Sequence, residues 1–569
     1  MKIKKHLSWL LALILLIAPL SVIASEPATG DSENLYVFAE VKEWGQSVTA
    51  VIVDLGETFT QAQVDAMDFE VTAHKTTRRI VNANNPLVVF DGARNITAAY
   101  VSHVKDRLDV ADRPAAGNYI VLELQYGFDN TRAQVNGSAT FCYNWTAPAR
   151  APYSGPNPYG GQAFRLNMSY TVVADGTELT VFIDGSTNNP VGMIQPIVDD
   201  FELIANPVEG FNQSYRMWTP PAHRGVGNPT TPMPLVVFHH GMGENFSRLA
   251  NGNDNEGVQL IAQEAATSWI TEAPEPAYVL MPQRAAGIGA PGYSRAGVSA
   301  FINHLIAEGR VDANRVYISG LSAGGGEVLT HIFEFPYMFA AAIPICPLGG
   351  NSVANMNRLP SIMHIPIWYV HSATDSVINP LTATQPHARL IELGALDARV
   401  SNFPAVHIPG SRGGWAPRVG LNDSWSVFGD HLPNGILMDG NGNPAIFYPN
   451  DHWNWIMLFN NIYVADGGIV PVDPRYGTAQ QYGITFMDWM FAQTRVQDIE
   501  LYAFVTQIPG NTNLLTIRVT EIHFSGNVVV FEETFTIRNN AADTYRVGNY
   551  NIFVDTKGNT QIRQLFIVE

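Results

Sequence analysis

The chain has 569 residues, of which 46% are hydrophobic, and it carries a formal net charge of −18. This length predicts two or three domains, and the apolar content supports large cores and excludes global disorder. The acidic excess repels polyphosphate backbones and argues against a nucleic-acid partner. Two cysteines are too few for a disulfide scaffold. We expect Cys142 and Cys346 to be unpaired, buried thiols in different domains and in apolar surroundings.

The N-terminus has the pattern of an export signal. Lys2, Lys4 and Lys5 precede an apolar stretch over residues 7–23, and residues 22–24 have the spacing of a cleavage site. We therefore expect residues 1–24 to be a secretory signal peptide and the mature protein to be secreted and extracellular. No later stretch reaches the roughly 18 apolar residues that cross a bilayer, so we expect no membrane span.

Residues 25–205 have the pattern of a β-sandwich. Short β-branched and aromatic runs are separated by Gly, Asn, Asp and Pro, at residues 35–38, 48–53, 119–124 and 179–183. Strands at such intervals, without helices between them, are typical of two packed antiparallel sheets.

The pattern changes over residues 206–496. Apolar strand-like runs at residues 234–240, 277–281, 316–319, 340–345 and 365–370 alternate with helical segments such as 298–308. Strands that are apolar on both faces and alternate with helices predict a parallel sheet covered on both sides. A closing helix is expected within residues 484–495.

The remaining residues, 497–569, return to a β pattern, with strand-like runs at 499–505, 514–519, 528–534 and 551–554. The expected architecture is therefore an α/β domain between a β-sandwich and a small C-terminal β-unit, and the resemblance described below makes these a catalytic domain and an Ig-like domain.

The pentapeptide Gly320-Leu321-Ser322-Ala323-Gly324 matches the Gly-x-Ser-x-Gly pattern of a nucleophile elbow. The pattern alone is weak evidence, so its setting matters. A turn and short strand over residues 312–319 precede it, and a helical segment over residues 327–333 follows it. Strand, serine turn and helix stand in the order that a nucleophilic Ser322 requires.

A serine hydroxyl needs an adjacent base, and the base needs an orienting acid, in the chain order Ser, acid, His. Asp375 lies in a loop just past the strand-like run at 365–370, where catalytic groups of such sheets gather. The alternative role of Asp375 is a turn or helix cap. Other acid candidates form a short list: Asp423, Asp430 and Asp451.

The histidine is harder to choose. Four histidines precede Asp375 and fail this order: His239, His240, His364 and His371. His387 lies on a probable helix too soon after Asp375, which leaves His407, His431, His452 and His523. We favour His452, which lies before a helix-like segment and can reach a serine at the catalytic edge, with His431 as the next choice. Residues 409–450, rich in Gly, Asn and Pro, form an insertion between Asp375 and His452 that we expect at the rim of the site.

The oxyanion of the reaction needs two backbone donors. One is the amide of Ala323, directly after the nucleophile. The other is expected from the Gly-rich loop after residues 234–240, with Met242 as the favoured donor and Gly243 as the second choice.

These motifs together resemble a known family. Residues 215–220, 235–243, 320–324, Asp375 and the His452-Trp453-Asn454-Trp455 segment are similar to secreted bacterial carboxylesterases of the α/β-hydrolase superfamily, particularly those with an Ig-like domain before the catalytic domain. The neighbouring feruloyl-esterase and polyester-depolymerase group shares the elbow. The resemblance covers residues 33–495 and implies Ser322 as nucleophile, His452 as base and Asp375 as orienting acid. The insertion 409–450 and the tail after 497 depart from the simplest family pattern.

The sequence thus predicts an extracellular serine esterase that acts on a small-molecule or polymer-linked ester and needs no metal or organic cofactor. A serine peptidase with the same triad is the second hypothesis, but no propeller or helical cap is evident. A non-catalytic cell-surface or carbohydrate-binding protein is the third.

Overall fold

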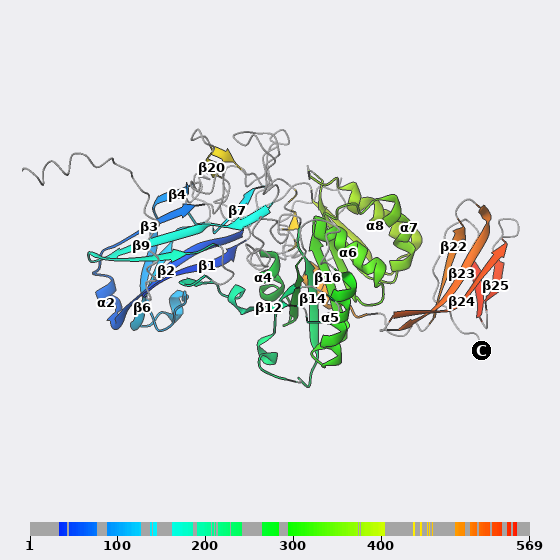
Figure 1. Cartoon of the computed structure of the whole chain (residues 1–569), viewed down its shortest axis with the longest axis horizontal. Helices are drawn as coiled ribbons and strands as arrows, with labels where there is room; N and C mark the ends of the chain where they lie inside the picture. Colours follow the sequence, from blue (N-terminus) through cyan, green and yellow to red (C-terminus); the bar gives the residue numbers. More distant parts are fainter. Residues whose placement is uncertain are drawn as a thin grey trace, which may run out of the picture.

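The computed structural model describes residues 34–42, 45–76, 88–126, 137–138, 140–144, 162–185, 190–205, 207–209, 211, 214–227, 229–241, 264–283, 294–373, 375, 377–403, 436–438, 444–446, 452, 454–455, 458, 484–495, 501–508, 511–523, 526–536, 543–547 and 550–554. The expected signal peptide, residues 1–24, lies outside the described residues, as does most of the insertion 409–450. An N-terminal group of strands, a central sheet with helices and a C-terminal group of strands follow one another along the molecule (Figure 1). None of the helices in these described ranges is long and apolar enough to span a membrane.

The N-terminal unit is a sandwich of two sheets, as the sequence predicts. The first has the order β11-β1-β2-β6-β5 and the second the order β10-β9-β3-β4. The strands of the first sheet are β1 (Leu35–Lys42), β2 (Gly45–Thr60), β5 (Ile96–Ser102), β6 (Ala116–Leu124) and β11 (Met193–Ile194). Those of the second are β3 (Phe69–Thr76), β4 (Val88–Ala93), β9 (Asn167–Ala174) and β10 (Thr177–Ile183). A short helix α2 (Gln61–Val64), a 3-10 turn η1 (Val110–Asp112) and a hairpin of β7 (Phe141–Asn144) and β8 (Gln162–Arg165) complete it.

Alternating side chains of the two sheets form the sandwich core. In β9 every second residue from Met168 to Ala174 is buried, and Val51 and Val53 of β2 belong to the same apolar cluster. A strict period of two is expected where one face of a strand is buried and the other meets water. Val41 of β1 and Tyr126 pack instead against the core of the catalytic domain, so the two domains share an apolar contact.

The catalytic sheet has eight strands in the order β12-β13-β15-β14-β16-β17-β18-β19. Their bounds are β12 (Phe201–Ala205), β13 (Ser214–Trp218), β14 (Met233–His239), β15 (Tyr278–Pro282), β16 (Val311–Leu321), β17 (Ala341–Ile345), β18 (Ile367–Ser372) and β19 (Ala398–Phe403). The strands β14 to β19 pair in parallel, and β12 and β13 pair antiparallel. The sheet therefore begins at Phe201, a few residues before the boundary expected at 205/206.

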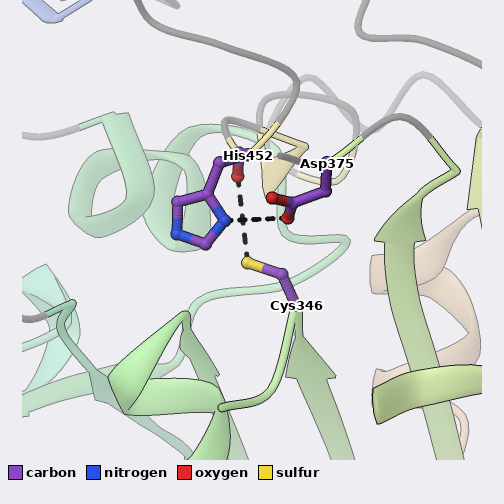
Figure 2. Close-up of side chains that lie close together, drawn as sticks. All are labelled: Cys346, Asp375 and His452. Carbon is purple, nitrogen blue, oxygen red and sulfur yellow. Dashed lines mark hydrogen bonds and ion pairs between the residues drawn. The ribbon is translucent and has the colours of Figure 1, made fainter. Parts of the chain in front are cut away.

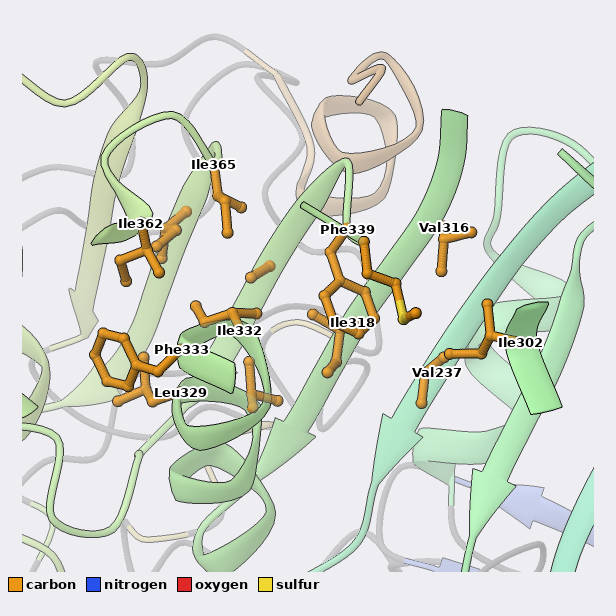
Figure 3. Packing of buried hydrophobic residues seen from close by; sticks show 14 of the residues in the cluster. Val237, Ile302, Val316, Ile318, Leu329, Ile332, Phe333, Phe339, Ile362 and Ile365 are labelled. Atoms are coloured by element: carbon orange, nitrogen blue, oxygen red, sulfur yellow. The ribbon is translucent and has the colours of Figure 1, made fainter. Parts of the chain in front are cut away.

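Both faces of this sheet are buried, which explains its continuous apolar strands. In β14, Val236 and Phe238 face one cluster, whereas Leu235 and Val237 face the other. The second cluster contains side chains of the helices α5, α6 and α8, and Figure 3 shows its packing. The first contains side chains of α4 and α10. The helix bounds are α4 (Glu264–Thr271), α5 (Arg295–Ala307), α6 (Ala323–Glu334), α7 (Val353–Arg358), α8 (Leu381–Leu393) and α10 (Phe486–Phe491), with 3-10 turns η2 (Val198–Asp200), η3 (Pro221–His223) and η5 (Leu359–Ile362).

The C-terminal unit consists of strands, as expected. A three-stranded antiparallel sheet contains β22 (Leu501–Ile508), β23 (Asn511–His523) and β24 (Gly526–Thr536), and a hairpin contains β25 (Asp543–Val547) and β26 (Tyr550–Val554). A further hairpin, β20 (Ile436–Met438) and β21 (Pro444–Ile446), lies within the insertion.

Candidate active site

Ser322 occupies a sharp turn between β16 and α6. The strand ends at Leu321, the helix begins at Ala323, and Ser322 has φ 57° and ψ −116°. Residues that carry a side chain rarely adopt this backbone conformation, which costs of the order of 1–3 kcal/mol. Three backbone hydrogen bonds hold the turn: Ser322 N–H donates to Ile345 O, while Gly326 and Leu348 N–H donate to Ser322 O. The strand, serine turn and helix that the sequence predicts are therefore present in that order, and Ser322 is largely buried.

Asp375 lies in the loop between β18 and α8, three residues past the carboxyl end of β18. The backbone N–H groups of Val377 and Ile378 donate to Asp375 Oδ1 at 2.8 Å and 2.9 Å. These two bonds aim the other oxygen, Oδ2, at His452. The loop position that the sequence predicts and the orientation of the carboxylate thus agree.

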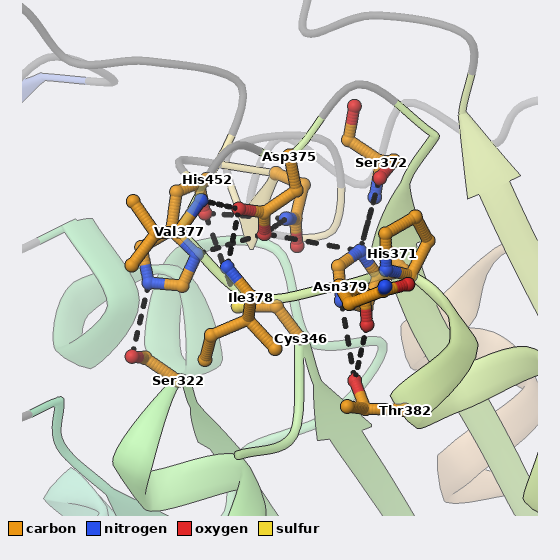
Figure 4. A network of polar contacts seen from close by, with 12 residues as sticks. Ser322, Cys346, His371, Ser372, Asp375, Val377, Ile378, Asn379, Thr382 and His452 are labelled. Carbon is orange, nitrogen blue, oxygen red and sulfur yellow. Dashed lines mark hydrogen bonds and ion pairs between the residues drawn. The ribbon is translucent and has the colours of Figure 1, made fainter. Parts of the chain in front are cut away.

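His452 stands between these two residues. Its Nδ1 lies 2.8 Å from Asp375 Oδ2, and its Nε2 lies 3.0 Å from Ser322 Oγ (Figure 4). An ionised carboxylate can only accept hydrogen bonds. His452 Nδ1 therefore carries the hydrogen, and Nε2 is left as the acceptor for the serine hydroxyl.

The segment of His452 is anchored by apolar packing. Trp455 and Leu458, spaced by three residues, belong to the apolar cluster on the α4 and α10 face. The Trp455 ring also meets the His452 ring edge to face, with centroids 5.5 Å apart. Helix-like spacing therefore fixes the histidine at the catalytic edge, although 77 residues separate it from Asp375.

The charges around Asp375 favour its ionised form. Burial alone would raise the pKa of Asp375, but the hydrogen bond and charge of His452 outweigh burial and hold the pKa below its usual value. A second histidine, His371, has its Nδ1 3.8 Å from Asp375 Oδ2. Burial lowers the pKa of His371 to about 4, against the opposing charge of Asp375. At neutral pH, His371 is therefore uncharged and does not compete with His452 as a cation.

Cys346 lies directly beneath the same group, just after β17 (Figure 2). It is a free, fully buried thiol, which confirms that part of the prediction, whereas the side chain of Cys142 lies outside the described residues. Cys346 belongs to the apolar cluster on the α4 and α10 face, as expected. Its Sγ also lies 3.8 Å from His452 O and close to Asp375, polar neighbours that the sequence did not predict. Burial and the charge of Asp375 raise the pKa of the thiol. The thiol is therefore protonated and donates weakly to the His452 carbonyl.

One ligand-type atom from each of Cys346, Asp375 and His452 lies within 4.8 Å of the others. Asp375 Oδ2 and His452 Nδ1 already share a hydrogen at 2.8 Å. A cation between them would have to displace that hydrogen.

Of the two predicted oxyanion donors, Ala323 is described and Met242 is not. Ala323 is the first residue of α6, so its N–H belongs to the positively polarised end of the helix. Gly241, the residue before Met242, lies beside the elbow: a Cβ at Gly241 would be 3.8 Å from Ser322 Cβ. The described chain therefore ends its course after β14 beside Ser322, and the proposed donor Met242 comes next in the sequence.

The other candidates take different places. His387 lies on α8, and Asp423, Asp430, Asp451, His407 and His431 lie outside the described residues, as does the side chain of His523. Sequence reasoning missed Asn454, whose buried side chain contacts both Asp375 and His452. Its position two residues after the favoured histidine was the available signal.

Comparisons with known proteins agree with this arrangement. The family described as esterase Ig-like N-terminal domain matches residues 34–178, and the family described as esterase PHB depolymerase matches residues 213–345. Both matches are to esterase families, and they stand in the order of the two domains seen in the structure. The search of curated proteins finds no match.

One solved structure that covers most of the chain shares its fold, and others match a part of it. The crystal structure of a thermostable esterase has a TM-score of 0.50 at 23% identity, covering 81% of this chain and 100% of that chain. A putative dienelactone hydrolase from Klebsiella pneumoniae has a TM-score of 0.25 at 17% identity, covering 36% of this chain and 85% of that chain. Esterase 2 of Thermogutta terrifontis has a TM-score of 0.27 at 14% identity, covering 36% of this chain and 82% of that chain. An esterase Ig-like domain and an esterase domain thus follow one another, and the chain is a carboxylic ester hydrolase.

Proposed function

We propose that this protein is an exported serine carboxylesterase that uses Ser322, His452 and Asp375 as its catalytic triad. The observation that carries the proposal is the continuous chain of hydrogen bonds from Ser322 Oγ through the His452 ring to Asp375 Oδ2, at 3.0 Å and 2.8 Å. All three side chains are at least nine-tenths buried. In such surroundings an ion pair formed during the reaction is screened less than in water.

In the first half of the reaction, Ser322 Oγ attacks the ester carbonyl carbon. His452 Nε2 accepts the hydroxyl proton, and the resulting imidazolium is stabilised by the Asp375 carboxylate. His452 then donates this proton to the leaving alcohol as the carbon–oxygen bond breaks. The products of this half are the free alcohol and an acyl ester on Ser322.

The tetrahedral intermediate carries a negative oxygen that needs donors. The N–H of Ala323 supplies one at the N-terminus of α6, and we propose Met242 N–H, next to Gly241, as the other. One such donor is typically worth about 10²–10³ in kcat. In the second half, His452 removes a proton from water, which attacks the acyl group and releases the acid and Ser322.

Export is a separate part of the proposal. It rests on the lysines at positions 2, 4 and 5, the apolar stretch 7–23 and the cleavage-site spacing before residue 25. Sequencing the N-terminus of the protein from the cell exterior tests it. A start at Ser25 supports export, and retention of Met1 in a cytosolic protein contradicts it.

The catalytic proposal is tested with a fluorophosphonate probe and a panel of acyl esters. We expect the probe to modify Ser322 and both labelling and hydrolysis to disappear in Ser322→Ala, with kcat falling about 10⁶-fold. The matched control is Ser361→Ala, because Ser361 Oγ donates only to Arg358 O, away from the site. Ester hydrolysis by the Ser322→Ala variant would overturn the proposal.

A further inference from the structure

We propose that Asn454 is a positioning residue that holds the acid and the base of the triad in register. This inference rests on the proposed function of Ser322, Asp375 and His452. Asn454 is fully buried, and a single nitrogen of its side chain contacts both partners. Its Nδ2 lies 3.3 Å from Asp375 Oδ2 and 3.2 Å from the backbone oxygen of His452.

The two hydrogens of one amide group explain this double contact. An amide NH₂ carries two donors that point in different directions. One reaches the carboxylate, and the other reaches the main chain of the residue that the carboxylate must face. Asn454 therefore couples the orientation of the acid to the backbone of the base.

The hydrogen bonds of Asp375 show what Asn454 adds. Oδ1 accepts from Val377 and Ile378, and Oδ2 accepts from His452 and Asn454. Each oxygen thus has two donors, which fixes the rotation of the carboxylate. Removal of the Asn454 side chain leaves His452 as the one remaining donor to Oδ2 among the described residues. Oδ2 is the carboxylate oxygen that faces the base.

The other titratable groups around Asp375 do not replace this donor. They are His371, His452 and Cys346, which lie on β18, on the segment before Trp455 and after β17, respectively. His371 Nδ1 contacts the backbone of Ser372 and lies 3.8 Å from Asp375 Oδ2, beyond hydrogen-bond distance. Cys346 donates to the His452 carbonyl and has its pKa raised by burial, so it adds no charge.

The chemical consequence concerns the balance of charge between acid and base. A carboxylate that accepts an amide hydrogen bond has part of its charge stabilised, so it attracts a neighbouring proton less. Without Asn454, the Asp375 carboxylate stabilises the imidazolium of His452 more strongly. The base then stays protonated to a higher pH, while its aim at Ser322 becomes looser.

Two variants test this inference through the pH profile of kcat/KM. Asn454→Leu has a similar size and no donor, and Asn454→Asp has the same shape but adds a negative charge. We expect the acid limb to move to higher pH by about half a unit in Asn454→Leu and further in Asn454→Asp. We also expect kcat to fall about 10- to 100-fold, with KM nearly unchanged.

The matched control is Asn351→Leu, which makes the same substitution at a partly exposed asparagine whose Nδ2 donates to Gln385 Oε1. Its acid limb should stay at the wild-type pH. Urea unfolding of each variant separates positioning from stability. Asn454→Asp, which keeps the native shape, provides the profile if Asn454→Leu does not fold.

A folded Asn454 variant with an unmoved acid limb and wild-type kcat would overturn the inference, even if its stability were lower. Failure of the proposed function would give a different result, because the Ser322→Ala variant would then retain ester hydrolysis.

Discussion

A Cβ atom at Gly324 would lie 2.1 Å from the backbone oxygen of His239. The first turn of α6 therefore touches the main chain of β14, and this contact brings the elbow beside the loop that starts at Gly241. We expect Gly324→Ala to destabilise the catalytic domain by about 2–3 kcal/mol, because backbone atoms cannot move aside like a flexible side chain. Urea unfolding and the hydrolysis rate of an acyl ester measure the two effects.

Gly227→Ala is the matched control for this substitution. No heavy atom lies within 4 Å of a Cβ at Gly227, so this variant should keep wild-type stability and hydrolysis. Equal stability of Gly324→Ala and Gly227→Ala would contradict the backbone contact.

The conformation of Ser322 leads to a second prediction. Its φ of 57° with ψ of −116° strains a residue that carries a Cβ but not a glycine. We therefore expect Ser322→Gly to be more stable than Ser322→Ala by about 1 kcal/mol, although both lack the nucleophile and both are inactive. Thermal unfolding of the two inactive variants measures the difference.

Ser319 provides the comparison, since it lies in β16 and is not among the residues with positive φ. In this strand a glycine loses more backbone conformational entropy on folding than an alanine does, so Ser319→Gly should be less stable than Ser319→Ala. The same order of stability at Ser322 would show that the elbow is not strained.

Much of the fold was predictable from the sequence because its signals are local. The strands of the catalytic sheet were recognised as continuous apolar runs, and the elbow by its glycines at positions 320 and 324. The start of the sheet at Phe201 was missed, because Phe201 is the one buried residue of β12 and the strand lacks the continuous apolar run of the central strands. Such a strand is assigned by its partner, β13, which local sequence does not reveal.

The surroundings of the triad were less predictable, because they arise from contacts distant in sequence. Cys346 looked like a core thiol, yet it lies beneath a histidine 106 residues further along the chain. His371 precedes Asp375 in the chain and therefore fails the order Ser, acid, His. Chain order does not reveal that its side chain packs beside Asp375. Asn454 carries no motif, so only the positions of both its partners reveal its double contact.

The hydrogen bond between Asp375 and His452 gives a third prediction. In Asp375→Asn the side chain keeps its shape, but its amide favours the wrong tautomer of the imidazole, so kcat should fall about 10⁴-fold. KM should change little, because the acid acts through His452. Steady-state kinetics measure both values.

Asp397→Asn is the control for this variant. Asp397 accepts hydrogen bonds from Trp489 Nε1 and Arg399 Nε, away from the triad. Its replacement should leave kcat at the wild-type value, and an equal loss of kcat in both variants would contradict the role given to Asp375.

The fourth prediction concerns stability at low pH and the buried residue His331 on α6. Its ring nitrogens lie 3.0 Å from Ser299 Oγ and 3.4 Å from His239 Nε2. Burial, with a smaller contribution from the charge of Arg295, lowers the pKa of His331 to about 3 from an ordinary value of 6.5. Between these two pH values the unfolded chain is protonated at this position and the folded chain is not.

The unfolded state therefore binds more protons in this window, so stability is full above pH 6.5 and falls as the pH drops, by about 1.4 kcal/mol per unit. The free energy of unfolding of His331→Gln should depend less on pH, losing about 2 kcal/mol less than the wild type between pH 7 and pH 5. Urea unfolding at the two pH values measures this difference. His304→Gln, at a half-exposed site on α5, should keep the wild-type dependence. If the free energy of unfolding of His331→Gln showed the same pH dependence as the wild type, His331 would be protonated in the folded protein. A contact between neutral His331 and His239 would then be ruled out.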